Sequence, residues 1–429
     1  MKKVPAVRLV EGEDAQALPG LPDELRLAMT EVAGAAREGL LAMSVAVGLQ
    51  VMAELLEVEI AAKAGPRHAK QPGRLARRHG SAPGSVVLGG RRVPVDRPRA
   101  RTLDGHEVQL ATWQAFTDDD LLGQLVMERM LAGLATRRHQ AAAEPVGSKI
   151  NQTARATSKS AVSRRLVAAT GKALGELMSR DLAELQVAAL MVDGIQVAGR
   201  CCVVALAILA DGTKLPVGLW DGSTENATVV RHLLADLQGR GLDASQGLLV
   251  VIDGAKALAS AVRQVFGELA LIQRCTLHKR RNVADHLPEA ERARVDAKLA
   301  RAFNDPDPDA GLRAARQLAG GLQRKHPGAA ASLREGVEEM FTVRRLGIDG
   351  RLAHTLTSTN PVESMLSIAR TTCRNVKRWR DGQMVCRWMA AGMVAAERSF
   401  RRLKGCKDMP RLVAALARHA EEVTVELSA

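Results

Sequence analysis

The pattern of apolar and polar positions is clearest in the middle of the chain, where short apolar runs are separated by Gly, Asp and Lys. Runs of this length, bounded by turn residues, are typical of buried strands. They predict strands over 187–192, 201–210, 214–220, 247–252 and 270–272. Helical spacing of apolar residues predicts helices over 226–238 and 255–266. The expected order β-β-β-α-β-α-β indicates an α/β domain.

Helical patterns dominate on both sides of this domain. Segments 22–62 and 117–140 are expected to be helices, and three consecutive aspartates near the start of the second suit a helix N-terminus. Residues 276–345 show several helical segments and no strand pattern, which predicts an all-helical insertion. Another helix is expected over 361–379.

These patterns divide the chain into a basic, mostly helical N-terminal part, a core in two pieces and a helical tail. The expected divisions are a helical and basic region over 1–110, a helical region with a DNA-binding segment over 111–185, core pieces over 186–275 and 346–400, the helical insertion over 276–345 and a helical tail over 401–429.

The stretch from Lys63 to Arg101 is unusually rich in arginine, glycine and proline. Two β-type runs, 85–88 and 92–95, are joined through Gly89-Gly90, which predicts a small basic hairpin. Two interpretations remain open for this stretch: a solvated basic linker, or a surface that contacts the DNA backbone.

Residues 157–166 combine small hydroxyl side chains with basic ones at the start of a helix. This composition is typical of a recognition helix in a helix-turn-helix, because small residues let the helix enter the major groove while longer ones reach bases and phosphates. An ordinary N-capped basic helix is the alternative. The predicted DNA contacts here are Lys159, Ser160, Ser163, Arg164 and Arg165.

Composition favours a soluble globular protein that binds a polyanion. Hydrophobic residues make up 46% and charged residues 25% of the chain, which is the balance of a folded globular protein. The net charge of +14 attracts polyanions, although a basic housekeeping enzyme or a ribosome-associated factor would share it. We therefore expect nucleic acid as the partner.

Other features bear on location. Six scattered cysteines suggest a reducing compartment, and the start of the chain lacks the apolar segment of a secretory signal. The longest apolar run, 201–210, is about half of the ~20 residues that a spanning helix needs. We expect no membrane association and a cytoplasmic, nucleoid-associated protein.

The sequence contains no tyrosine. DNA breakage through a covalent phosphotyrosine is therefore chemically impossible, which excludes tyrosine recombinases and topoisomerases of that kind.

Two aspartates stand out among many Asp-Gly pairs, most of which are simple turns. Asp193 and Asp253 each follow an apolar strand, the first and the fourth of the predicted core. The ends of neighbouring strands at one edge of an α/β sheet can hold two carboxylates close enough to share a metal ion. Asp221 and Glu225 are reserve carboxylates near the third strand.

Glu363 is the candidate for a third carboxylate. It lies in Ser358-Thr359-Asn360-Pro361-Val362-Glu363, where Asn360 as N-cap, Pro361 at the first position and Glu363 at the third also resemble a capping box. The two roles are compatible, because a glutamate in the first turn of a helix can still project toward the sheet.

Three carboxylates without a histidine cluster suit Mg²⁺, which prefers oxygen ligands and retains waters. Two such ions, about 3.5–4 Å apart, can activate an attacking water or 3′-hydroxyl and stabilise the leaving oxygen of a phosphodiester. The expected cofactor is therefore Mg²⁺, in two ions, with Mn²⁺ as a substitute.

The ordered set of motifs resembles the Mutator-type transposases of bacterial insertion sequences, within the DDE transposase and retroviral integrase superfamily. The set comprises Asp193, Asp253, the helical insertion, Ser-Thr-Asn-x-x-Glu-Ser around Glu363, the segment 218–226, and Cys275-x-x-His278. The resemblance covers about residues 150 to 410 and implies a ribonuclease-H-like core with a mixed sheet. It also implies that Glu363 is the third catalytic ligand.

The resemblance further implies binding to terminal inverted repeats, hydrolytic nicking at the element ends and transfer of the 3′-hydroxyl to target DNA. Because two ends must be brought together, a homodimer or larger symmetric assembly is expected on double-stranded DNA. Two alternatives remain: a structure-specific nuclease with the same core, and a DNA-binding regulator that has lost catalysis.

Cys275 and His278 invite a zinc interpretation, but no second pair of ligands lies at suitable spacing. We expect the pair to pack near the active site, with His278 as a phosphate contact. Further DNA contacts are predicted at Lys279, Arg280, Arg370, Arg374, Lys377 and Arg378.

Overall fold

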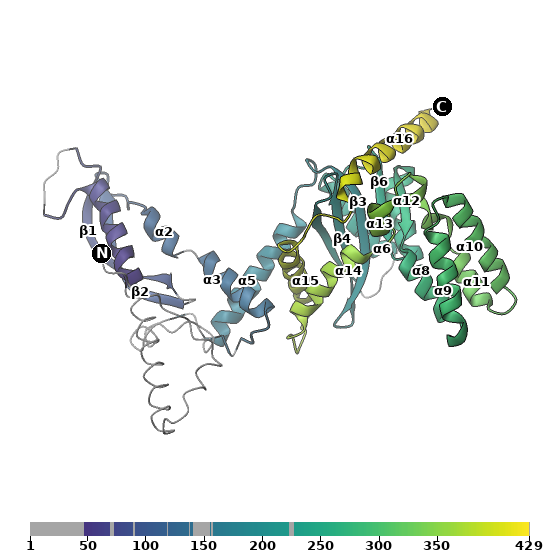
Figure 1. The fold of residues 1–429 in the computed structure, drawn as a ribbon. Coiled ribbons are helices and arrows are strands. Elements are labelled where there is room, and N and C mark those ends of the chain that lie inside the picture. Colours follow the sequence, from purple (N-terminus) through teal and green to yellow (C-terminus); the bar gives the residue numbers. More distant parts are fainter. Residues whose placement is uncertain are drawn as a thin grey trace, which may run out of the picture. The chain divides into compact units, whose positions relative to one another are not determined.

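The computed structural model describes residues 47–68, 73–88, 91–117, 119–136, 138–139, 155, 158–222 and 227–428 (Figure 1). The chain divides into two compact units. The hairpin unit comprises Met1–Val126 with Ala135–Arg165, and the sheet unit comprises Met127–Leu134 with Leu166–Ala429. The part of the expected 22–62 helix that precedes residue 47 lies outside the described residues, and so does Glu225.

The hairpin unit contains a helix over residues 47–64, strands β1 (Ala76–Leu88) and β2 (Arg91–Thr102), and helix α2 (Ala111–Thr117). One helix face carries Met52, Leu56 and Ile60, which pack against Val86 and Val93 of the strands. The predicted hairpin is confirmed, and it has a core of its own. A solvated linker is therefore wrong for this stretch.

The hairpin is longer than its sequence predicts. Prolines and arginines fill both strands, and a register irregularity falls between Arg78 and Ser81. Proline is tolerated here because both strands of a two-stranded sheet are edge strands, the position in a sheet where proline is found. The strands therefore extend well beyond the short apolar runs that predict them.

Helix α3 (Asp119–Leu131) is separate from α2 and shorter than the single helix expected over 117–140. It ends before Gly133, whose φ of +107° is a conformation that L side chains rarely adopt. Helix α5 (Lys159–Met178) follows and buries Val162, Leu166 and Leu177.

A five-stranded mixed sheet forms the centre of the sheet unit. Its strands are β3 (Val187–Val197), β4 (Arg200–Leu209), β5 (Lys214–Gly222), β6 (Leu248–Ile252) and β7 (Ala270–Arg274). The order is β5-β4-β3-β6-β7, in which β3, β4 and β5 pair antiparallel while β6 and β7 run parallel to β3. The predicted α/β class and element order are confirmed for this region.

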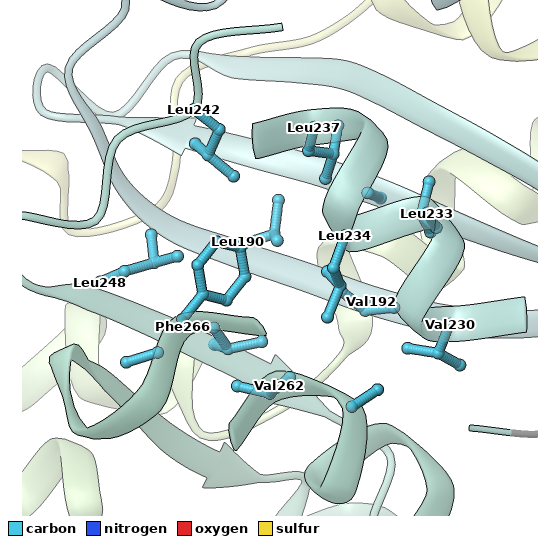
Figure 2. Packing of buried hydrophobic residues seen from close by; sticks show 14 of the residues in the cluster. Leu190, Val192, Val230, Leu233, Leu234, Leu237, Leu242, Leu248, Val262 and Phe266 are labelled. Atoms are coloured by element: carbon cyan, nitrogen blue, oxygen red, sulfur yellow. The ribbon is translucent and has the colours of Figure 1, made fainter. Parts of the chain in front are cut away.

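Helices cover both faces of the sheet. On one face, α6 (Ala227–Gly239) and α7 (Lys256–Phe266) bury leucines and valines against alternate residues of the strands, as Figure 2 shows for Leu190, Val192 and Phe266. Helix α14 (Asn360–Cys373) contacts β3, and α15 (Gly382–Glu397) contacts β5 and α14. Because side chains alternate along a strand, Met191 and Asp193 lie on the face opposite to Val192.

Residues 276–345 are helical, as predicted, and form a group beside the sheet (Figure 1). Phe303 and Phe341 meet edge to face in their shared core, with ring centroids 5.7 Å apart. The elements are α8 (Thr276–Asp285), α9 (Glu289–Phe303), α10 (Pro308–Leu322), α11 (Pro327–Arg334), η3 (Glu338–Met340) and α12 (Thr342–Arg345).

The C-terminal helices differ from expectation in one place. Helix α13 (Gly350–Leu356) precedes α14, and α16 (Met409–Ser428) ends the described chain. The helix expected over 361–379 stops at Cys373, and Trp379 instead packs edge to face on Trp388 of α15. In the part of the chain that the structure describes, no helix is both long enough and apolar enough to cross a membrane.

Candidate active site

The sheet register brings Asp193 and Asp253 together. Val192 of β3 and Ile252 of β6 are the last paired residues of the two parallel strands, so both aspartates follow directly at the point where pairing stops. The expectation that β3 ends before Asp193 is wrong, because β4 continues to pair with β3 as far as Val197. Asp193 thus lies on a rigid strand, which fixes its position.

Burial and neighbouring charge act strongly on Asp193. The side chain is buried, and its Oδ1 accepts a hydrogen bond from the backbone N–H of Gly194 (2.9 Å). Desolvation and the carboxylate of Asp253 raise its pKa from 3.8 to about 7, and Glu363 contributes in the same direction. Only groups within electrostatic reach produce such an effect. The carboxylates of Asp253 and Glu363 are therefore within electrostatic reach of Asp193.

Glu363 extends into this region from the first turn of α14. The hydroxyl of Thr359 donates to its Oε1 (2.7 Å), and His278 Nε2 lies 3.7 Å from the same oxygen. The N-cap of α14 is Thr359 rather than Asn360, and it makes no side-chain cap hydrogen bond. The capping-box interpretation of this segment is therefore wrong.

Thr359 connects Glu363 with the Cys-x-x-His pair. Its backbone N–H donates to Cys275 Sγ (3.4 Å), and its hydroxyl oxygen lies 3.3 Å from His278 Nδ1. Cys275 is fully buried, and its N–H donates to the carbonyl of Ile252 (2.7 Å), at the end of β6. The contact with Cys275, opposed by burial, raises the pKa of His278 to about 9, with help from Glu363 and Asp193. A protonated His278 thus faces the carboxylates.

Among the residues that the structure describes, no three histidine, cysteine or acidic side chains form a group that could hold a metal ion as they stand. The three carboxylates of the site nevertheless offer the oxygen donors that Mg²⁺ prefers. The reserve carboxylate Asp221 is engaged elsewhere, because Arg200 donates to both of its oxygens (2.9 and 2.7 Å).

A sequence model of the family described as "Transposase, Mutator family" matches residues 26–402. The chain belongs to this family. Among the relatives, a transposase for the insertion sequence element IS6120 of Mycolicibacterium smegmatis is 30% identical over 205 residues, which are 46% of this chain and 62% of the relative. The chain thus spans about three fifths of that relative's length.

Two rhizobial relatives give similar values. A probable transposase for the ISRM3-like element of Sinorhizobium fredii is 27% identical over 310 residues, which are 70% of this chain and 73% of the relative. A transposase for ISRM3 of Rhizobium meliloti is 29% identical over 48% of this chain and 52% of its own.

In this Mutator-family member, the first two turns of α5 present most of the predicted DNA contacts to solvent. Lys159, Ser160, Ser163 and Arg164 are exposed, while Arg165 is half-buried. On the opposite side of the helix, Ala161 and Val162 are buried. An amphipathic helix of this kind leaves its polar face available to a ligand.

The predicted contacts on α8 are mostly used inside the protein. Lys279 is buried and donates to the carbonyls of Ser332 (2.7 Å) and Glu335 (2.8 Å), so its assignment as a DNA contact is wrong. Arg280 is half-buried and holds both oxygens of Asp296 (2.6 and 2.5 Å). Charge alone does not distinguish such a buried cation from a surface one.

The basic residues of α14 and the segment after it remain open to solvent. By contrast, the predicted contact His278, on α8, is half-buried, and its ring lies against Thr359 and Glu363. The predicted contacts Arg370, Arg374, Lys377 and Arg378 are all exposed.

Sequence reasoning missed two residues near the site. Thr359 is fully buried and contacts both Glu363 and Cys275. It lies inside the Ser-Thr-Asn motif, so its position next to Glu363 was a usable signal. Arg274 is also buried, at the end of β7, and the only available signal was a charge that closes an apolar strand.

Proposed function

We propose that this chain is a DNA transposase that binds terminal inverted repeats, nicks the element ends by Mg²⁺-dependent hydrolysis and transfers the freed 3′-hydroxyl to target DNA. Family membership supports the reaction class. The observation that carries the proposal is the register that ends at Val192 and Ile252, which leaves Asp193 and Asp253 adjacent on neighbouring strands.

We also propose that the sheet unit has a ribonuclease-H-like core. Three antiparallel strands followed by two parallel ones, in the order β5-β4-β3-β6-β7, support this assignment. Helices on both faces and a helical insertion between β7 and α14 are consistent with it. In such a core, Asp193 of β3, Asp253 directly after β6 and Glu363 of α14 would lie in one region of the sheet.

Asp193, Asp253 and Glu363 would hold two Mg²⁺ ions, or Mn²⁺ in their place. When bound, such ions activate the attacking oxygen and stabilise the leaving oxygen of a phosphodiester. The raised pKa of Asp193 supports this role, because burial and the nearby carboxylate of Asp253 both disfavour its negative charge, which a bound cation would stabilise. Glu363 would leave His278 when it joins the two aspartates.

The protein's own groups would then orient the reaction. Thr359 holds one oxygen of Glu363 through its hydroxyl, and the rigid strand β3 fixes Asp193. A protonated His278 beside Glu363 provides a positive charge at the site for a phosphate oxygen. Because the chain lacks tyrosine, no covalent phosphotyrosine is formed.

DNA would be held by cations outside the site. The exposed side chains at the start of α5 and those around the end of α14 would contact phosphates. A homodimer or larger symmetric assembly would bring two element ends together.

The proposal is tested with purified protein and a duplex that carries an element end, its flank and a separate target duplex. We expect Mg²⁺-dependent nicking at the end, followed by covalent joining of the 3′-end to the target strand. Cleavage without joining would support a structure-specific nuclease instead. End binding without cleavage, unchanged when Asp253 is replaced by Asn, would support a catalytically inactive regulator.

A further inference from the structure

Arg274 is a buried cation whose hydrogen bonds are made inside the protein. It ends β7, and its side chain is only 6% exposed. Its guanidinium pairs with Glu339 through Nε and with Glu335 through Nη1 (3.2 Å). A buried guanidinium is stable only with such partners. Both partners belong to the helical insertion, so Arg274 connects β7 with that insertion.

The same guanidinium reaches the turn that carries Asp253. Nη1 of Arg274 donates to the carbonyl of Gly254 (2.7 Å), the residue directly after Asp253. Asp253 Oδ1 accepts from the N–H of Ala255 (2.9 Å), and Gly254 has a φ of +114°. Glycine can rotate freely at such a position, so the hydrogen bond from Arg274 restricts a turn that is otherwise soft.

The helical insertion is shaped to accept the guanidinium. Gly336 has a φ of +61°, and a Cβ at this position would overlap the Arg274 guanidinium. The neighbouring Gln273 is fully buried, donates to the carbonyl of Met340 (3.0 Å) and accepts from the N–H of Val343 (3.0 Å). Two consecutive side chains of β7 therefore fix the 335–343 segment against the end of the sheet.

We propose that Arg274 is a positioning residue for Asp253: through the Gly254 carbonyl it holds the turn in which this carboxylate lies, and it joins that turn to the helical insertion. Arg274 acts through the main chain and does not touch the substrate. Its catalytic consequence rests on the function proposed above.

Two substitutions test separately the charge of Arg274 and the position of its guanidinium. Arg274→Gln removes the bonds to Glu335 and Glu339 and shortens the reach to Gly254, whereas Gly336→Ala keeps the arginine but displaces its guanidinium. We expect each to lower Mg²⁺-dependent cleavage at least tenfold and to raise the Mg²⁺ concentration for half-maximal cleavage. Arg274→Lys, which keeps one donor for Gly254, should restore part of the rate.

Arg240→Gln is the matched control. Arg240 is a shielded arginine that pairs with Asp236 and donates to the carbonyls of Val217 (2.6 Å) and Leu177 (3.2 Å), in the same unit but not at the Asp253 turn. It should lower stability to a similar degree while the rate and the Mg²⁺ requirement per folded molecule stay unchanged.

Hydrogen exchange gives a readout that needs no activity. In Arg274→Gln, the peptide over residues 250–258 should exchange faster than in the wild type and in Arg240→Gln. Unchanged exchange together with an unchanged Mg²⁺ requirement would overturn the inference. If the wild type does not cleave DNA at all, the proposed function fails, and faster exchange in this peptide still decides whether Arg274 holds the turn.

Discussion

The pKa values of carboxylates are shifted in opposite directions in the two units of the chain. In the hairpin unit, Glu57 and Glu107 are each surrounded by arginines, and hydrogen bonds from Arg78 and Arg99 hold the pKa of these carboxyls below the usual range. In the sheet unit, burial and the nearby Asp253 raise the pKa of Asp193 to about 7. Arginines of the same unit thus stabilise the charges of Glu57 and Glu107, whereas burial and the neighbouring carboxylate disfavour the charge of Asp193.

This contrast supports the proposed location of the active site in a strongly basic protein. Arginines are abundant, yet among the described residues none forms an ion pair with Asp193 or Asp253. A fold optimised only for stability would neutralise such carboxylates. Carboxylates without an arginine partner support the proposed divalent cation site.

The largest effect is expected from substitutions of the three carboxylates in the sheet unit. Asp193→Asn, Asp253→Asn and Glu363→Gln should each lower Mg²⁺-dependent cleavage by about 1000-fold or more, because each removes an oxygen donor of the proposed metal site. Binding to end DNA should persist in all three, as measured by electrophoretic mobility shift. Asp211→Asn, in an exposed turn, is the control. Full cleavage by any triad variant would remove that residue from the site.

The second effect concerns stability and its pH dependence. Between pH 3.8 and about 7 the folded protein keeps a proton on Asp193 that the unfolded chain releases, so this group lowers stability as the pH rises through that window. The difference in pKa corresponds to at most about 4 kcal/mol. Asp193→Asn cannot titrate, so it should be more stable than the wild type at pH 8 and nearly equal at pH 4.

Urea denaturation without divalent cations, followed at both pH values, measures this difference. Equal stability of the two proteins at pH 8 would show that Asp193 is not under electrostatic stress. Added Mg²⁺ should narrow the gap by stabilising only the wild type.

A smaller effect, on stability, is expected for the Glu59 carboxylate of the hairpin unit. Glu59 accepts from the N–H groups of Ala111 (2.8 Å) and Thr112 (3.0 Å) at the start of α2. Although burial opposes them, these bonds and one from Lys63 lower the pKa of Glu59 to about 2. The stability it provides is therefore present above pH 4.5 and lost as the pH falls toward 2.

Glu59→Ala should lower the stability of the hairpin unit by about 1 kcal/mol, the usual cost of losing a helix cap. Thermal denaturation at pH 7 measures the loss, with Glu54→Ala on the exposed side of the same helix as control. No difference between the two variants would show that the carboxylate does not support α2.

The smallest effect concerns the exposed cations of α5. Lys159→Ala and Arg164→Ala should each weaken binding to end DNA by less than about tenfold and reduce the salt slope by about one, because each removes one phosphate contact. Lys172→Ala, farther along the helix and paired with Glu176, is the control. If Lys172→Ala weakens binding equally, the DNA contacts are not concentrated at the N-terminal end of α5.

The sheet could be predicted because its strands are buried on both faces and read as short apolar runs. Asp193 and Asp253 followed from the same runs, since each directly follows the last residue that pairs in parallel. The extension of β3 beyond Asp193 could not be predicted, because the antiparallel partner β4 determines it.

Other features depended on tertiary partners. Lys279 has the sequence context of a surface cation, but carbonyls of Ser332 and Glu335, more than fifty residues away, accept its protons. The hairpin strands were longer than predicted, and their buried residues Ala76 and Ala100, outside the apolar runs, pack in one core with the helix over 47–64. Such partners lie far apart in sequence, where local patterns carry no information.

Iron-directed cleavage of the protein tests the central claim most directly. Fe²⁺ in place of Mg²⁺ generates hydroxyl radicals with ascorbate and peroxide, which cut the backbone beside the bound ion. We predict cuts next to Asp193, Asp253 and Glu363 that excess Mg²⁺ suppresses and that Asp253→Asn abolishes. Cuts confined to other segments, or an unchanged pattern in Asp253→Asn, would contradict a shared metal site of these three carboxylates.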